Sequence, residues 1–248
     1  MDHAAWCDQL DGEIERAAGV VAQVPVDAPV PSCPDWTVSD LTLHLGRVHR
    51  WAEGLVCALA DGPQVAATAF SDPGPPSADW LRAGGTSLVA TLRAADPEAP
   101  MWAWGADQHV AFWSRRQLHE TLIHRVDAQL AGGIPPGSDP EVAADGIDEL
   151  LVNLPSASRF SSKVANLRGQ GERLALVPTD ADSSWTITLA PDGFSIAGGS
   201  GEADATLSGP SLDLLLVLYR RWPLPESQVT VTGTPGLAEF WLANSALE

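Results

Sequence analysis

The chain has few basic residues and a large excess of acidic ones. Its 248 residues contain 14 Lys and Arg against 32 Asp and Glu, which gives a formal net charge of −18 at pH 7. Such a charge repels nucleic-acid backbones and anionic membrane surfaces. We therefore expect no nucleic-acid partner and no membrane partner. An anionic small molecule would need local positive charge, from a metal ion or from an Arg side chain.

Cysteine is also scarce. Cys7, Cys33 and Cys57 are widely spaced, and no Cys-x-x-Cys pair occurs. This spacing indicates neither a disulfide framework nor a thiolate zinc site. We predict that all three cysteines are small, buried, apolar side chains.

Long apolar runs are missing, although apolar residues make up 45% of the chain, enough for sizeable cores. No stretch reaches the roughly eighteen apolar residues of a membrane-spanning helix. The first residues lack the basic region and apolar core of a signal peptide. We expect a soluble, cytoplasmic protein with one large domain or two small ones.

The first half of the chain shows helical periodicity. Apolar residues recur every three or four positions, and in the first helix charges such as Glu13 alternate with them. Thr37 is a good N-cap for the second helix. The predicted helices cover residues 4–23, 38–60, 77–95 and 110–131. Helices of this length joined by Pro-containing loops favour a four-helix bundle.

Beyond residue 140 the pattern changes to a mixture of helices and alternating strands. The predicted helices cover 140–154, 210–219 and 235–243, and the predicted strands cover 173–178, 184–189, 203–209 and 228–232, with a hairpin turn at 191–193 and a returning strand from 194. The second half is therefore predicted to be a small α+β domain, with the boundary near residues 140–165.

Two of the predicted helices carry most of the metal-capable side chains. Glu120 and His124 are four residues apart, which places them about 40° apart on one helix face. His44 lies in the inward stripe of the helix over 38–60, whereas His49 is about 140° further round, so both cannot ligate one ion. A site with three such ligands and an open position is typical of catalytic zinc. The alternatives are a hydrogen-bonded core His44 and a solvated Glu120–His124 face.

The zincin motif His-Glu-x-x-His is excluded, because Ile123 stands where that motif needs His. In the second half, Arg220 and Arg221 end an apolar helix. One interpretation is structural, because the helix dipole alone favours Arg near a helix C-terminus. The functional interpretation is that these two Arg side chains bind an anion and act as an anion clamp.

Together these segments resemble the mycothiol-dependent maleylpyruvate isomerase family, whose N-terminal domain is a DinB-like metal-binding four-helix bundle. The resemblance rests on residues 30–51 with the motif Asp40-Leu-Thr-Leu-His44, on residues 101–104, and on the motif His119-Glu120-Thr-Leu-Ile-His124. It extends to residues 205–209 and 218–223 in the second half. It implies a DinB-like bundle over 1–150 and a small α+β domain, similar to sterol-carrier folds, over 151–248.

The resemblance also implies a site and a chemistry. A divalent metal ion, usually zinc, would be held by His44, Glu120 and His124, and mycothiol would be the thiol cosubstrate. The thiol would add to the double bond of a cis dicarboxylate, and elimination after bond rotation would give the trans isomer. The functional Arg of the family falls on Arg221, although Arg220 remains an alternative, and it would neutralise a substrate carboxylate.

Three functions remain open on the sequence alone. The first is the isomerase, and the second is a mycothiol S-transferase that detoxifies electrophiles with the same metal and thiol. The third is a non-catalytic, metal-dependent ligand-binding protein whose second domain holds an apolar ligand along residues 212–218. We expect an enzyme that acts on a small electrophilic or dicarboxylate substrate.

Overall fold

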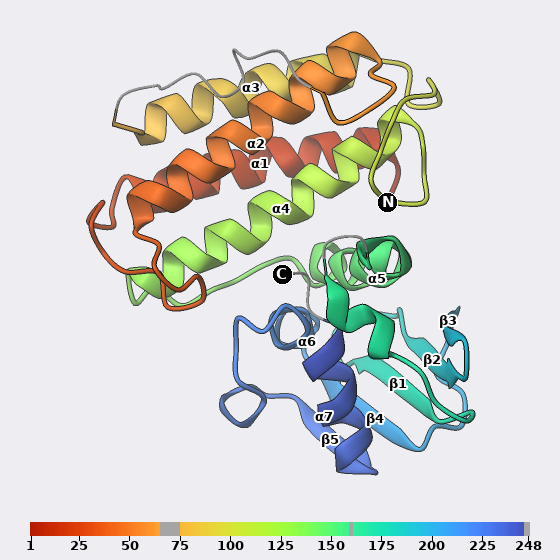
Figure 1. Ribbon diagram of the computed structural model, residues 1–248. Coiled ribbons are helices and arrows are strands. Elements are labelled where there is room, and N and C mark those ends of the chain that lie inside the picture. The colour runs from red at the N-terminus through yellow and green to blue at the C-terminus, as the bar shows by residue number, and fades with distance from the viewer. Residues whose placement is uncertain (65–74, 159–160, 246–248) are drawn as a thin grey trace. The chain divides into compact units, whose positions relative to one another are not determined.

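The computed structural model describes residues 1–64, 75–158 and 161–245 of the chain. It divides into two compact units, Met1–Gly137 and Ser138–Glu248 (Figure 1). The first unit is helical and the second combines helices with one sheet, which confirms the predicted fold class.

The first unit is a four-helix bundle. Its helices are α1 (His3–Val21), α2 (Val38–Ala58), α3 (Ala78–Ala94) and α4 (Val110–Ala131). Helices α1 and α2 each pack against both α3 and α4. The four helices predicted from periodicity are thus present, and buried apolar side chains from all four pack between them.

The start of α2 is fixed by a capping box. Thr37 Oγ1 accepts a hydrogen bond from the Asp40 amide at 3.3 Å, and Asp40 Oδ2 accepts one from the Thr37 amide at 2.9 Å. These bonds satisfy amide groups that the first turn of a helix leaves unpaired. Because they fix the first residue of the helix, they also fix the position of His44, which lies two turns further along α2.

Helices α2 and α3 approach closely at Gly46. A Cβ atom at this position would overlap the ring of Trp80, so the contact requires glycine. The Arg50 guanidinium lies over the same ring, 4.0 Å from its centroid. This packing holds α2 against α3.

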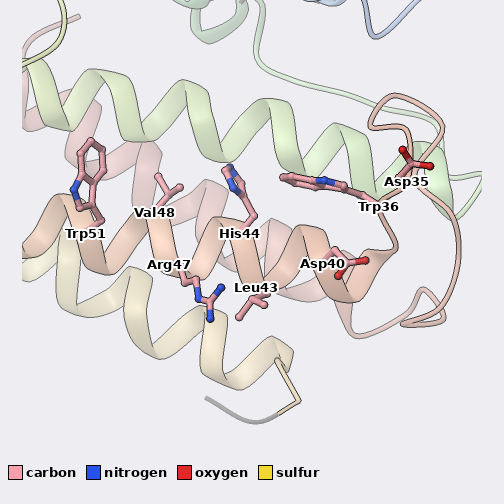
Figure 2. Close-up of a pocket in the computed structure, with 8 residues that line it drawn as sticks. All are labelled: Asp35, Trp36, Asp40, Leu43, His44, Arg47, Val48 and Trp51. Atoms are coloured by element: carbon pink, nitrogen blue, oxygen red, sulfur yellow. The ribbon is translucent and has the colours of Figure 1, made fainter. Parts of the chain in front are cut away.

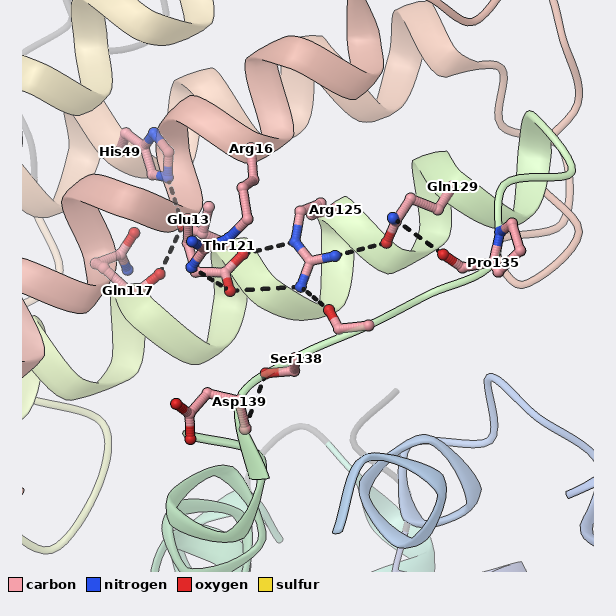
Figure 3. Close-up of polar contacts among 11 residues, drawn as sticks. Glu13, Arg16, His49, Gln117, Thr121, Arg125, Gln129, Pro135, Ser138 and Asp139 are labelled. Atoms are coloured by element: carbon pink, nitrogen blue, oxygen red, sulfur yellow. Dashed lines mark hydrogen bonds and ion pairs between the residues drawn. The ribbon is translucent and has the colours of Figure 1, made fainter. Parts of the chain in front are cut away.

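Helix α4 is buried on almost all sides despite its many polar residues. One row of these residues, which we call the Arg125 stripe, comprises Gln117, Thr121, Arg125 and Gln129. Arg125 Nε donates to Glu13 Oε2 of α1 at 2.6 Å, and Arg125 Nη1 donates to Gln129 Oε1 at 2.6 Å (Figure 3). The Glu13 and Arg125 side chains are only 1% and 2% exposed, so Glu13 is a core residue and not a surface charge.

The second unit is built around a mixed five-stranded sheet in the order β3-β2-β1-β4-β5. Strands β1 and β4 are parallel, with Leu174 opposite Ala205, and the other neighbouring strands are antiparallel. Helices α6 and α7 pack against β4, and α5 packs against α6. The bounds are α5 Pro140–Ala157, β1 Arg173–Pro178, β2 Trp185–Ala190, β3 Gly193–Gly198, β4 Ala205–Gly209, α6 Ser211–Leu218, β5 Thr230–Gly233 and α7 Pro235–Asn244.

Helix α5 differs from the prediction at its end. It continues through Pro155 to Ala157 instead of stopping at residue 154. Proline removes one backbone donor, but its fixed φ is compatible with a helical turn, and the buried side chains of Leu154 and Ala157 pack in the core. The predicted domain division at residue 150 lies inside this helix.

The three cysteines are free and differ in burial. Cys7 is buried, Cys33 is half-buried and Cys57 is exposed. The prediction of three buried apolar cysteines is therefore wrong for Cys57. Among the described residues, no helix is both long and apolar enough to cross a membrane.

Replacing Glu13 with Gln should destabilise the bundle strongly, because Arg125 would remain charged in the interior without a counter-ion. Removing one partner of a buried ion pair typically costs about 3–5 kcal/mol of unfolding free energy. Urea denaturation followed by circular dichroism measures this change. The control is Glu15→Gln, which removes one of the two exposed carboxylate partners of Arg82 and should change the midpoint little. Equal midpoints for the two variants would contradict the expectation.

Candidate metal centre

His44, Glu120 and His124 bring three donor atoms together in the first unit. His44 comes from α2, whereas Glu120 and His124 come from successive turns of α4. Glu120 Oε1 lies 3.3 Å from His44 Nε2 and 3.2 Å from His124 Nε2. The three donor atoms all lie within 4.8 Å of one another, so the residues selected by spacing in the sequence are neighbours in the fold.

The donor set fits a divalent ion of the zinc type. Zinc binds imidazole nitrogen and carboxylate oxygen at about 2.0–2.2 Å, usually in a tetrahedron, so two of its ligands lie roughly 3.3–3.5 Å apart. The two nitrogen–oxygen separations in the cluster are close to this value. Two imidazoles and one carboxylate occupy three corners and leave the fourth for water or a substrate.

The cluster is open on the His44 side. Side-chain exposure falls from 36% at His44 through 23% at Glu120 to 10% at His124. The Trp36 ring packs against both imidazoles, with its centroid 4.9 Å from that of His44 and 6.3 Å from that of His124. A small molecule can therefore reach the donor atoms past His44, whereas His124 is held inside the bundle.

A second carboxylate lies behind His124. Asp127 Oδ2 is 2.9 Å from His124 Nδ1, the ring nitrogen that does not face Glu120. Asp127 is fully buried, and its other oxygen accepts a hydrogen bond from the Ser32 hydroxyl at 2.5 Å. The Cys33 thiol donates to Asp127 Oδ2 at 3.6 Å. His124 is thus contacted by a carboxylate at each of its two nitrogens.

Electrostatics set the protonation of this cluster. Burial alone would raise the pKa of Glu120, but the charge of His124, hydrogen bonds from His124 and His44, and the charge of Arg116 hold it well below 4.5. Burial alone would lower the pKa of His124, yet the Glu120 carboxylate and the hydrogen bond to Asp127 raise it to about 9. Without an ion, the cluster at pH 7 is a carboxylate beside an imidazolium, so an ion that binds His124 must displace a proton.

His49 takes no part in the cluster. Its Nε2 lies 2.9 Å from Thr121 Oγ1, and the Thr121 hydroxyl donates to the Gln117 carbonyl at 2.6 Å, so His49 is the donor of the first bond (Figure 3). Burial lowers the pKa of His49 to about 3. His49 is therefore a neutral core residue that joins α2 to the Arg125 stripe.

A pocket of about 700 Å³ lies along the face of α2 that carries His44. Its volume is within the range of small-molecule sites. Figure 2 shows Trp36 to one side of His44 and Trp51 to the other. The lining residues are Asp35, Trp36, Asp40, Leu43, His44, Arg47, Val48 and Trp51.

Arg47 is a site residue that the sequence interpretation missed. It supplies the positive charge among the described lining residues of the pocket, and its Nε is buried without a hydrogen-bond partner. The signal was present, because Arg47 follows His44 by three residues and so shares its helix face. Asp127 is a second such residue, because it follows His124 by three residues and so shares its helix face.

Arg221, the predicted anion clamp, lies in the second unit just after α6. Its Nη1 donates to the Tyr219 carbonyl at 3.1 Å. Arg220 is exposed and adopts a left-handed backbone conformation with φ of 57°, the conformation that commonly ends a helix. Arg220 thus has a structural role at the end of α6, and the role of Arg221 toward a substrate stays a prediction.

Comparison with known proteins gave consistent matches over both units. Residues 7–129 match the family model of the mycothiol maleylpyruvate isomerase N-terminal domain, and residues 141–240 match the C-terminal domain model of the same isomerase. A search of curated proteins found no significant match.

Solved structures of a mycothiol-dependent maleylpyruvate isomerase and of a single-residue variant of it are similar to this chain in fold. Each is 14% identical, with a TM-score of 0.55 over 94% of this chain and 93% of theirs. The ubiquinone synthesis protein UbiJ-SCP2 is 20% identical over 45% of this chain and 93% of its own length, with a TM-score of 0.32.

In the metal-free protein, His124 should titrate near pH 9, while His49 should stay neutral down to about pH 3. The pKa of His124 is above the usual 6.5, so its contribution to stability is fully present below pH 6.5 and is lost as the pH rises through about 9. Long-range nitrogen–proton NMR spectra of the imidazoles measure both titrations, and His124→Gln assigns the signal. A His124 titration at or below pH 6.5 would contradict this arrangement of charges.

Proposed function

This chain belongs to the mycothiol maleylpyruvate isomerase family, and we propose that it is a metal-dependent enzyme that activates a low-molecular-weight thiol for addition to an electrophile. One observation carries the proposal: two imidazole nitrogens and a carboxylate oxygen converge beside an accessible pocket. We assign His44, Glu120 and His124 as the ligands of one ion, with zinc the best fit to nitrogen and oxygen donors.

The bound ion would lower the pKa of a thiol at the open position, so that thiolate is available at neutral pH. The residues of the chain do the rest of the binding. The indole rings of Trp36 and Trp51 offer apolar surface on either side of His44, and the Arg47 guanidinium offers a positive charge, which is scarce in this acidic chain. The thiol that we propose is mycothiol, after the family.

The reaction that we propose first is cis–trans isomerisation of a dicarboxylate such as maleylpyruvate. The thiolate sulfur forms a bond to one alkene carbon, and the π electrons move onto the conjugated carbonyl oxygen. Rotation about the resulting single bond follows. The electron pair then returns, the carbon–sulfur bond breaks, and the thiolate is regenerated with the trans product. No atom is consumed, and neither reactant is oxidised or reduced.

Arg221 is the residue that we propose for binding a substrate carboxylate. A dianionic substrate approaches a protein of net charge −18, so it needs a local cation. An Arg guanidinium can donate two parallel hydrogen bonds to one carboxylate, which also orients it. Arg220 is the less suitable neighbour, because its backbone position serves the end of α6.

Thiol transfer is the second candidate, and the lining of the pocket favours it. Leu43, Val48 and the two Trp rings present mostly apolar surface, which suits an apolar electrophile better than a dianion. In that reaction the sulfur–carbon bond is retained, and the adduct takes up a proton at carbon. The same ion and thiol would serve, with detoxification as the outcome.

His44→Ala and His124→Ala should each reduce zinc content from about one ion per chain to nearly none, because each removes one of three protein ligands. Metal analysis of dialysed protein measures the content, and circular dichroism checks the fold. His109→Ala is the matched control, because His109 is an exposed histidine that pairs with Asp107 and is not part of the cluster. Unchanged zinc in both ligand variants would refute the assignment.

Mycothiol stoichiometry should separate the two reactions. An isomerase should convert many maleylpyruvate molecules per thiol and leave the free thiol concentration constant, whereas a transferase should consume one thiol for each electrophile. Proton NMR of the substrate, together with thiol titration over time, measures both quantities in zinc-loaded protein. If thiol neither binds nor accelerates either reaction, the proposed function is wrong.

A further inference from the structure

We propose that Asp127 is a positioning residue whose carboxylate holds the His124 ring with Nε2 directed into the cluster, and so strengthens ion binding. The inference rests on the proposed metal site. Its basis is the 2.9 Å contact between Asp127 Oδ2 and His124 Nδ1, made by a carboxylate with no exposed surface.

The contact selects one tautomer of His124. An ionised carboxylate only accepts hydrogen bonds, so the Nδ1 nitrogen must carry the proton that they share. The lone pair of the neutral ring is then on Nε2, the atom 3.2 Å from Glu120 Oε1. The Nε2 lone pair can therefore bind an ion on the Glu120 side, whereas the protonated Nδ1 cannot bind an ion on the Asp127 side.

Asp127 is itself held in place by the loop that precedes α2. Ser32 donates to one carboxylate oxygen, and Cys33 donates to the other. A pairing between Pro29 and Thr37 closes this loop at its base. The same loop carries Trp36, which packs on the rings of His44 and His124. One loop therefore supports His124 from two directions.

Cys33, His124 and Asp127 also have potential ligand atoms within 4.8 Å of one another. An ion among these three would have to displace the Nδ1 proton and break the hydrogen bond to Asp127. It would also need a thiolate from Cys33, which currently donates to the same carboxylate. The hydrogen-bonded arrangement therefore favours an ion on the Nε2 side, with Asp127 as support.

The charge of Asp127 can be separated from its hydrogen bond by substitution. In Asp127→Asn the amide oxygen can still accept a hydrogen bond from Nδ1. The negative charge is lost, however, and this charge makes the imidazole Nε2 a stronger metal ligand. Outer carboxylates of this kind typically contribute 10–100-fold in metal affinity. Asp127→Ala removes the charge and the hydrogen bond together, so its effect should be larger.

The experiment is a titration of the full chain with Co²⁺, a visible-absorbing substitute for zinc, with competition by Zn²⁺. Asp127→Asn should weaken binding by about 10–100-fold and change the Co²⁺ absorption bands, while thermal unfolding of the metal-free variant reports on the fold. The matched control is Asp107→Asn, which removes the carboxylate from the other His–Asp pair, at exposed His109. It should leave affinity and spectrum unchanged.

Each result bears on a different claim. A wild-type chain that binds neither ion would overturn the proposed function, and this inference with it. A wild-type chain that binds normally while Asp127→Asn shows the same affinity and spectrum would overturn the positioning role alone. Loss of binding in Cys33→Ala, with a thiolate absorption band in the wild-type Co²⁺ complex, would place the ion on the Nδ1 side and would also overturn the inference.

Discussion

The buried ion pair between Glu13 and Arg125 fixes the rotation of α4, and the rest of the first unit depends on that rotation. Consecutive residues of a helix point about 100° apart. Because Arg125 is directed at α1 by its bonds to Glu13, the neighbouring His124 must point away from α1, toward α2 and His44. An interaction in the core thus determines the direction of a candidate metal ligand that it does not contact.

Helix α4 accommodates this arrangement with two parallel rows of polar residues. The Arg125 stripe connects it to α1 and α2 in the interior, and the row Arg116, Glu120 and His124 faces the pocket side. Residues four apart are bonded to one another at Gln117 and Thr121, at Arg125 and Gln129, and along the second row, as neighbours on a helix surface can be. A helix so polar can be buried because its charged groups, Arg116, Glu120, His124 and Arg125, meet partners, and the burial of unpaired charges would be far more costly.

Most of the fold could be predicted from the sequence, since periodicity, caps and turn residues are local signals. Spacing also singled out Glu120 and His124 and preferred His44 to His49, and the three selected residues lie together. The burial of Glu13 could not be predicted, because it depends on Arg125, which is far away in the chain. The contact of Asp127 with His124 is local, but its bonds to Ser32 and Cys33 join segments more than ninety residues apart and could not be predicted from spacing.

The position of the cluster within the chain has a consequence for how such proteins diversify. All three donors, Asp127 and the lining residues of the pocket lie before Gly137, in a unit with its own core. Substitutions after that point leave the donor set intact. Under the function that we propose, the sequence of the second unit could therefore vary without replacing any of the proposed ligands in the first unit.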